Sequence, residues 1–221
     1  MTKTVPPEVI REAIACGLTD LGENRVKEAR AKQIALDWGL EAGGPEPRAL
    51  SPQPVRWHLI GYLQRNKAKH AVELFSVIHS VESLELIEEL ERQAAKQASG
   101  FKLQAPSKLL EVLIQVNISG EATKFGCRPE EAAALAVAAA RSAHLKLLGL
   151  MAIPPFTENP EESRAHFRRL RQLREDVAVA CSRQPAALQL SMGMSNDFEV
   201  AIEEGADIVR IGTAIFGERA E

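Results

Sequence analysis

Three short stretches of this sequence carry side chains that could do chemistry together. Lys3 supplies a primary amine in "MTKT", and Arg210 supplies a guanidinium in "RIGT". The stretch "SMGMSND" offers the Ser195 hydroxyl at a predicted helix start, while Gly212 and Thr213 directly follow the strand that carries Arg210. An amine can form a Schiff base with a carbonyl, and amides with hydroxyls at a helix start can hold an anion. This set fits a phosphorylated aldehyde with a ring nitrogen, such as pyridoxal 5′-phosphate.

Each of these residues also has a simpler interpretation. A lysine this close to a terminus is normally a frayed, solvated charge, and Ser195 could merely cap the last predicted helix, with Gly212 a turn glycine. A third possibility is that Lys3 attacks a phosphorylated substrate directly, as in an aldolase, with Arg210 on a carboxylate or phosphate. The aldolase interpretation predicts a colourless protein.

The elements that must position these residues alternate between strands and helices. Helical spacing recurs in segments such as 6–17, 83–97, 128–143, 159–181 and 196–205. Between them lie short apolar stretches, which predict eight strands: "TKT", "DLGEN", "VRWHLIG", "SVIHSV", "EVLIQVNI", "LKLLGLMAI", "ALQLSMG" and "DIVRIGT". Strict alternation of this kind predicts an α/β fold with a parallel sheet, and eight strands predict a closed (β/α)8 TIM barrel. An open doubly wound sheet is the alternative, although no G-x-G-x-x-G follows an early strand.

A barrel of this kind brings the candidate residues to one place. Its active site lies at the C-terminal ends of the strands, and phosphate is commonly held after strands seven and eight. Lys3 is predicted at the end of strand one, while Ser195 and Gly212 follow strands seven and eight. The sequence therefore predicts a single site at this end of the barrel.

Composition limits the class of protein. The chain has 221 residues and a formal net charge of −3, which gives no electrostatic reason to expect nucleic acid or an anionic membrane as partner. We expect one domain over 1–221, no membrane span, no metal site, and a cytoplasmic location, since no signal peptide is recognised. The three cysteines form no C-x-x-C pair and predict free thiols. The stretch 39–55 is predicted to be a mobile surface loop, and a shorter loop is predicted around 100–108.

The longer motifs resemble a known family. "GENRVKEA", "WHLIGYLQRNKAK", "IHSVESL", "VLIQVNISGEATKFGC", "GLMAIPP" and "LSMGMSNDFEVAIEEGADIVRIGTAIFG" are similar to the pyridoxal phosphate homeostasis proteins. These are single-domain proteins whose barrel resembles the N-terminal domain of alanine racemase. The resemblance spans residues 2–217 and leaves the 39–55 stretch outside it.

The resemblance implies roles for individual residues. It implies pyridoxal 5′-phosphate bound as an aldimine to Lys3. It further implies Asn24 and Met192 beside the cofactor and Arg210 facing the ring nitrogen. The phosphate would be held by Ser195, Gly212 and Thr213. "WHLIG", "QRNK" and "HSVE" are signatures near the barrel mouth without assigned roles.

Two features differ from the family pattern. Family members carry a helix and a full first strand ahead of the lysine, whereas this chain begins two residues before it. We therefore expect a barrel truncated before strand one. Tyr62 stands where many members have histidine, and we expect that change to be tolerated.

The resemblance favours a carrier over an enzyme. It implies intracellular homeostasis of vitamin B6, by buffering or delivering the cofactor, with apo-enzymes as possible partners and a monomer or weak dimer. A pyridoxal-phosphate-dependent amino-acid racemase is the alternative, but two-base racemisation needs an acid/base group opposite the lysine, and nothing marks Tyr62 as that group. Arg210 would also leave the ring nitrogen unprotonated, because a guanidinium cannot accept a proton.

The histidines have a modest role in these predictions. His70, His144 and His166 lie on or beside helices, without metal-ligand spacing, and are expected at the surface. His58 and His79 lie on predicted strands. They could line the barrel mouth, or they could be hydrogen-bonded core histidines.

Overall fold

The structure is a computed structural model that describes residues 1–38, 55–100, 109–121 and 123–217. The predicted loop at 39–55 lies outside these residues except for Val55, and the predicted loop around 100–108 lies almost wholly outside them.

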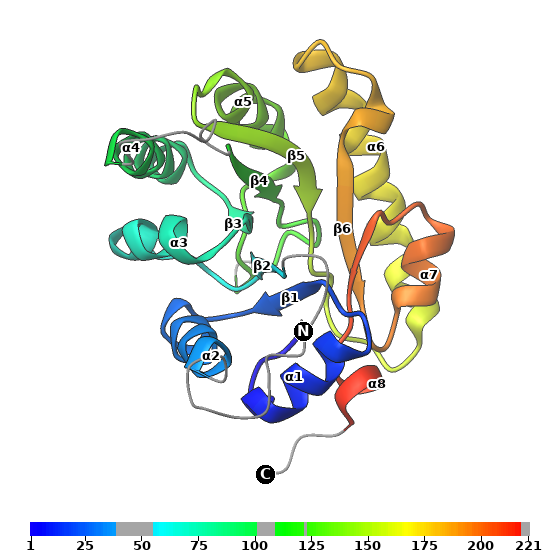
Figure 1. Cartoon of the computed structure of the whole chain (residues 1–221). Helices are drawn as coiled ribbons and strands as arrows, with labels where there is room; N and C mark the ends of the chain where they lie inside the picture. The colour runs from blue at the N-terminus through cyan, green and yellow to red at the C-terminus, as the bar shows by residue number, and fades with distance from the viewer. Residues whose placement is uncertain (39–54, 101–108, 122, 218–221) are drawn as a thin grey trace.

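Seven parallel strands form one sheet in chain order, with each strand hydrogen-bonded to the next (Figure 1). The strands are β1 (Asp20–Glu23), β2 (Arg56–Leu59), β3 (Val77–Val81), β4 (Leu110–Gln115), β5 (Leu145–Met151), β6 (Gln189–Met194) and β7 (Ile208–Arg210). A simple sequential order of parallel strands is that of a (β/α) barrel, whereas a doubly wound sheet reverses its strand order. The α/β barrel prediction is thereby confirmed and the open-sheet alternative is wrong.

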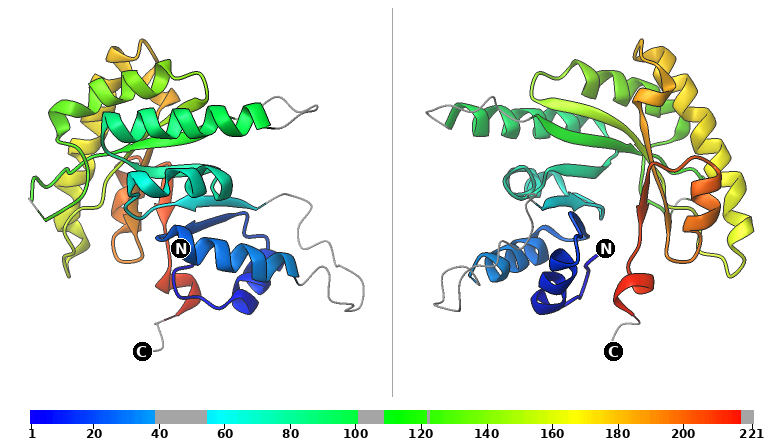
Figure 2. Two further views of the ribbon diagram at one scale, coloured as in Figure 1. Left: turned by 90° about the vertical axis from the view of Figure 1, so that its left-hand side faces the viewer. Right: turned by 45° about the vertical axis from the view of Figure 1, so that its right-hand side comes forward.

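Helices cover the outer face of the sheet, as the views in Figure 2 show. They are α1 (Pro7–Ala15), α2 (Val26–Trp38), α3 (Ala68–Leu74), α4 (Leu84–Gly100), α5 (Pro129–Arg141), α6 (Arg164–Ala180), α7 (Phe198–Glu203) and α8 (Thr213–Phe216), with short 3-10 turns η1 (Arg65–Lys67), η2 (Pro160–Ser163) and η3 (Pro185–Ala187). Proline starts α1 and α5, and Gly205, at φ +91°, follows the end of α7, as the sequence pattern predicts. None of the helices in the described ranges is long and apolar enough to cross a membrane.

The predicted first strand at residues 2–4 is wrong: this segment forms no strand in the structure. Lys3 and Thr4 form a turn, with Thr4 at φ +62° and the Val5 N–H donating to the Thr2 carbonyl oxygen at 3.0 Å. Because the chain turns back at this point, only Met1 and Thr2 run beside the sheet. Two residues are too few for a β-ladder, so the described chain has seven strands instead of eight.

Met1 and Thr2 nevertheless link the two ends of the sheet. The Thr2 N–H donates to the Gly22 carbonyl oxygen of β1 at 2.9 Å, and the Met1 amino group donates to the Ile211 carbonyl oxygen just after β7. A cavity of about 360 Å³ lies between β1 and β7, with Met1 on its wall. The barrel is therefore nearly closed, with two residues bridging the seam at one level.

The core has an outer and an inner layer. The outer layer packs helices against the sheet and includes Leu90, Phe167 and Leu170, all fully or almost fully buried. The inner layer contains an apolar cluster of strand residues, Val77, Leu113 and Met151. The same strands also carry buried polar side chains, including His79, and these form part of the site described below.

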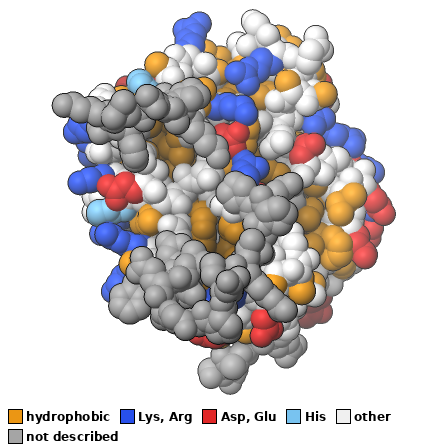
Figure 3. Space-filling view, viewed as in Figure 1, with side chains coloured by type: hydrophobic (Ala, Val, Ile, Leu, Met, Phe, Trp, Pro, Cys, Tyr) orange, Lys and Arg blue, Asp and Glu red, His pale blue; other side chains and the backbone are white. Residues whose placement is uncertain are grey.

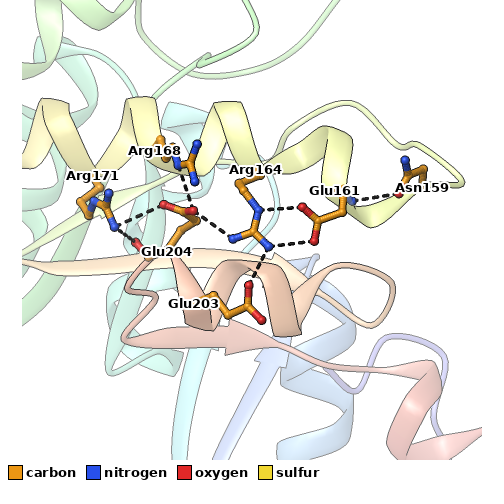
Figure 4. A network of polar contacts seen from close by, with 7 residues as sticks. All are labelled: Asn159, Glu161, Arg164, Arg168, Arg171, Glu203 and Glu204. Atoms are coloured by element: carbon orange, nitrogen blue, oxygen red, sulfur yellow. Dashed lines mark hydrogen bonds and ion pairs between the residues drawn. The ribbon is translucent and has the colours of Figure 1, made fainter.

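An arginine-rich network fixes the helix pair behind β6 and β7 (Figure 4). The Glu204 carboxylate, at the end of α7, pairs with Arg164, Arg168 and Arg171 of α6 at 3.0 to 3.2 Å, and Glu203 also pairs with Arg164 at 2.6 Å. Multiple ion pairs on one carboxylate hold α7 against α6. The basic stretch at 164–174 thus faces carboxylates within the molecule, as the flanking acidic residues of the sequence indicate.

Candidate functional site

Lys3 lies between two anchored residues. Thr2 is fully buried, and its hydroxyl donates to Glu23 Oε1 at 2.6 Å. On the other side the Thr4 N–H donates to Glu28 Oε1 at 2.8 Å. Lys3 itself is half-buried. The backbone on both sides of Lys3 is therefore held in place, unlike that of a frayed terminal residue.

Lys32 of α2 completes this anchor. Its ammonium donates to the Thr2 carbonyl oxygen at 2.5 Å, to Glu23 Oε1 at 2.7 Å and to Glu28 Oε1 at 2.9 Å. Lys32 and Glu23 are buried, so their charges interact in a medium of low polarity. Sequence reasoning missed Lys32 and Glu28. Their i, i+4 spacing was visible, but the contacts with residues 2 and 4 depend on the fold.

Ser195 and Gly212 come together as the predicted anion cradle requires. The Gly212 N–H donates to the Ser195 hydroxyl oxygen at 3.1 Å, and Thr213 begins α8 directly afterwards. The alternative role of Ser195 as a helix cap finds no support: α7 begins at Phe198 after Asp197, whose side chain accepts from the Met194 N–H at 2.7 Å.

The Ser195–Gly212 contact adjoins the segment that carries Lys3. A Cβ built on Gly212 would lie 3.6 Å from atoms of Met1, and one built on Gly22 would lie 3.8 Å from the Met1 Cα. Met1 thus packs between the Gly22 backbone and the Gly212 loop. Lys3, two residues further along, lies at the same end of the sheet.

Arg210 is a buried cation at the end of β7. It is 4% exposed, and its guanidinium donates to the Ser191 hydroxyl oxygen at 2.7 Å and to the Ala152 carbonyl oxygen at 2.8 Å. Burial lowers the pKa of Arg210 to about 10, which leaves it positively charged at neutral pH. Within the described ranges it makes no ion pair with a carboxylate.

Asn24 follows β1 and lies against the end of β2. A Cβ built on Gly61 would lie 2.3 Å from the Asn24 carbonyl oxygen, so only glycine allows this close approach of the two backbones. The Ile60 N–H also donates to the Glu23 carbonyl oxygen at 2.9 Å. The glycine of "WHLIG" therefore sets the position of Asn24.

The "QRNK" stretch borders a basic cavity of about 510 Å³ beside Asn24. Its cationic lining residues are Arg25, Lys27, Arg30 and Lys67. Figure 3 shows Lys and Arg side chains along the left edge of the molecule, on the side where α3 lies in Figure 1. Tyr62, which also lines this cavity, is exposed and stacks on Phe125 at a centroid distance of 4.5 Å.

Met192 lies within the main core. It is fully buried in the same cluster as Leu190 and Ala201, and it lines neither of the two cavities described above. The structure thus gives Met192 a packing role, and its contact with a cofactor remains a prediction.

His58 and His79 are hydrogen-bonded core residues, which was the second of the two interpretations from sequence. His58 Nδ1 lies 2.9 Å from His79 Nε2, and His79 Nδ1 lies 2.9 Å from the Ser191 hydroxyl. Sequence reasoning missed Ser191 as a partner of Arg210. The two-residue alternation within "RWHL", "VIHSV" and "LQLSM" was a signal that these side chains share the interior face.

Comparison with known proteins identifies the family. The family model described as alanine racemase, N-terminal domain, matches residues 7–220. A protein of Aquifex aeolicus named pyridoxal phosphate homeostasis protein is 46% identical over 219 residues, which cover 99% of this chain and 85% of that protein. The chain belongs to this family. The resemblance inferred from the motifs is confirmed.

Solved structures of a further relative support the same fold. PipY of Synechococcus elongatus without PLP matches with a TM-score of 0.80 at 35% identity, covering 98% of this chain and 90% of that chain. PipY with PLP bound matches with a TM-score of 0.76 at 34% identity over the same shares. This member of the homeostasis protein family thus shares the barrel of a relative whose structure has been solved with and without PLP.

Proposed function

We propose that this chain binds pyridoxal 5′-phosphate through Lys3 and serves in homeostasis of the cofactor, by buffering or delivering it. The observation that carries the proposal is that the anchored Lys3 segment packs beside the Ser195–Gly212 contact. The relatives' name and the PLP-bound PipY structure support the same ligand.

The residues fit the groups of this cofactor. Ser195 and Thr213 offer hydroxyl donors for a phosphate, and because the Ser195 oxygen accepts from the Gly212 N–H, the Ser195 O–H is left to donate to the phosphate. Arg210 offers a buried cation for the ring nitrogen, and its two described bonds use only two of five N–H donors. Asn24 follows β1 at the same end of the sheet.

When bound, pyridoxal phosphate supplies an aldehyde that condenses with a primary amine and releases one water. Lys3 presents that amine, and Lys32 with Glu23 holds its backbone. Ser195 and Gly212 would hold the phosphate beside the segment that carries Lys3.

Arg210 favours a carrier over an enzyme. A guanidinium has no lone pair to accept or share, so it donates to the ring nitrogen and leaves that nitrogen unprotonated. An unprotonated ring is a weaker electron sink, which disfavours transamination and decarboxylation. Apo-enzymes that receive the cofactor are the partners that a delivery role requires, and the cytoplasm is the location that suits it.

Borohydride reduction after incubation with pyridoxal phosphate tests this function. We expect a stable mass increase on the peptide containing Lys3, its loss in Lys3→Ala, and no change in Lys69→Ala, whose lysine is exposed on α3. A label distributed over surface lysines, or none, would contradict the proposal. A colourless protein would favour the aldolase interpretation, and robust turnover in a racemase assay would favour the racemase.

A further inference from the structure

A continuous chain of hydrogen bonds crosses the barrel interior and ends at Arg210. It runs from Asp20 Oδ1 to His58 Nε2 at 2.9 Å, and from His58 Nδ1 to His79 Nε2 at 2.9 Å. It continues from His79 Nδ1 to the Ser191 hydroxyl at 2.9 Å, and from Ser191 to the Arg210 guanidinium at 2.7 Å. We call these five residues the polar chain.

The two ends of the polar chain set the direction of every bond. Arg210 can only donate, so the Ser191 oxygen accepts from it, and at the other end the ionised Asp20 carboxylate accepts from His58 Nε2. Because burial disfavours a charged imidazole, His58 Nδ1 is an acceptor, and so is His79 Nδ1, which accepts from the Ser191 hydroxyl. His79 then carries its proton on Nε2 and donates to His58 Nδ1. His58 in turn carries its proton on Nε2 and donates to the ionised Asp20. With both imidazoles neutral, these bonds give each ring one tautomer.

The chain is sheltered from solvent except at its acidic end. His79 and Ser191 are fully buried and His58 is 7% exposed. Asp20 is exposed, and it lines the cavity between β1 and β7 together with both histidines and Arg210. Every N–H and O–H of the chain beyond Arg210 points away from the guanidinium. The negative end of each dipole therefore points toward it. Arg210 has no ion pair within the described residues, so these aligned dipoles help to compensate its buried charge, together with the Ala152 carbonyl and the more distant Asp197 carboxylate.

Burial favours the neutral form of both histidines. It lowers the pKa of His79 well below the usual value, with His58 and Arg210 adding to the shift. It also lowers the pKa of His58, which Asp20 opposes. Neutral imidazoles are what the bond directions require.

We propose that Ser191 and His79, backed by His58 and Asp20, are positioning residues that hold the Arg210 guanidinium in one orientation as a charged donor for the cofactor's ring nitrogen. This inference rests on the proposed function, because it assigns a role to Arg210 in the same site. It adds residues from the far end of β1 and from β2, β3 and β6 to the determinants of cofactor binding.

The decisive variant is Ser191→Ala, with Ser80→Ala as its matched control. Ser80 is also a fully buried serine, but its hydroxyl has no hydrogen-bond partner in the described structure, and it is the neighbour of His79 on β3. We expect Ser191→Ala to raise the Kd for pyridoxal phosphate roughly tenfold, the effect of one hydrogen bond to a charged group. We also expect it to shift the absorbance maximum of the bound cofactor, which reports on the ring nitrogen. Ser80→Ala should change neither quantity.

Two further variants separate orientation from folding. Ser191→Thr keeps the hydroxyl and should restore the wild-type absorbance maximum. In His58→Ala the deleted ring borders an existing cavity, so added imidazole should restore both the maximum and the Kd. A raised Kd that neither Ser191→Thr nor added imidazole reverses would show a merely structural role and overturn the inference.

The failure of this inference differs from the failure of the proposed function. If the wild-type protein is not labelled at Lys3, the proposed function is wrong. If it is labelled normally while Ser191→Ala and His58→Ala match wild type in Kd and absorbance, only the polar chain's role is wrong.

Discussion

Lys32 and Glu23 form a buried ion pair at 2.7 Å, and both side chains also bond to Thr2, the residue before Lys3. The pair joins α2 to the end of β1 and extends to a segment that has no ladder of its own. The position of the candidate nucleophile therefore depends on an ion pair whose members lie at least twenty residues away in the chain.

Removing one member of this ion pair should lower the stability of the folded protein. In Lys32→Met the Glu23 carboxylate stays buried without its cation, and we expect the free energy of unfolding to fall by about 3 to 5 kcal/mol. Urea denaturation measures this, with Lys27→Met as an exposed control on the same helix. Borohydride labelling of Lys3 should slow in parallel. A loss below about 1 kcal/mol would contradict the anchoring role of Lys32.

The contribution of Ser195 to ligand affinity should depend on whether the ligand carries a phosphate. Ser195→Ala removes a hydroxyl from the predicted phosphate cradle, so we expect the Kd for pyridoxal phosphate to rise roughly tenfold. The affinity for pyridoxal, which lacks the phosphate, should not change. Fluorescence titration with both ligands checks this. Ser99→Ala is the control, because Ser99 is an exposed residue of α4. Equal loss for the two ligands would show that Ser195 does not contact the phosphate.

Gly61 should tolerate no side chain. In Gly61→Ala the new Cβ would lie 2.3 Å from the Asn24 carbonyl oxygen, and a backbone atom cannot move aside as a side chain can. We expect a loss of about 1 to 3 kcal/mol in the free energy of unfolding. We also expect weaker cofactor binding, because the clash displaces Asn24. In the control Gly22→Ala the nearest atom is the flexible end of Ile60 at 3.2 Å, and the effect should be smaller. Thermal and urea unfolding give the comparison.

Stability should fall as the medium becomes mildly acidic. Burial lowers the pKa of His79 and of His58 in the folded protein, whereas both titrate near about 6.5 when unfolded. The unfolded chain therefore binds more protons below this value. The stability that neutral histidines provide is complete above about pH 6.5 and is lost as the pH falls toward their folded pKa values. We expect a loss of about 1 to 3 kcal/mol between pH 7 and pH 5.5.

A variant of His79 isolates this contribution. The groups that face the two rings are Asp20, Arg56, Glu111, Ser191 and Arg210. In His79→Asn the free energy of unfolding should change clearly less between pH 7 and pH 5.5 than in wild type. His70→Asn, at a position whose side chain is 43% exposed, should leave this change as it is in wild type. Burial raises the pKa of Glu82, which acts with the opposite sign and is common to all three proteins. Equal slopes of unfolding free energy against pH for wild type and His79→Asn would refute the prediction.

Local sequence patterns were sufficient for most of the elements. Apolar runs of strand length, helical spacing, and the stops at proline and glycine are properties of a few neighbouring residues. They placed seven strands and the helices α1, α4, α5, α6 and α7, but they did not place α2. The motifs were specific enough for the family and the cofactor, and the roles of Lys3, Ser195 and Gly212 stay predictions. The segment at residues 2–4 was misassigned because its β-propensity is local, whereas its turn is stabilised by contacts with β1 and α2.

The tertiary structure alone decided how the polar residues pair. Lys32 meets Thr2 thirty residues away, and His79 meets Ser191 across 112 residues. Such partners are brought together by strand order and by which face each side chain occupies, and no local pattern encodes the final distance or the direction of a hydrogen bond. The sequence by itself determined which residues can do the chemistry. Only the folded barrel decided what holds Lys3 and Arg210 in position, because burial and long-range packing set those contacts.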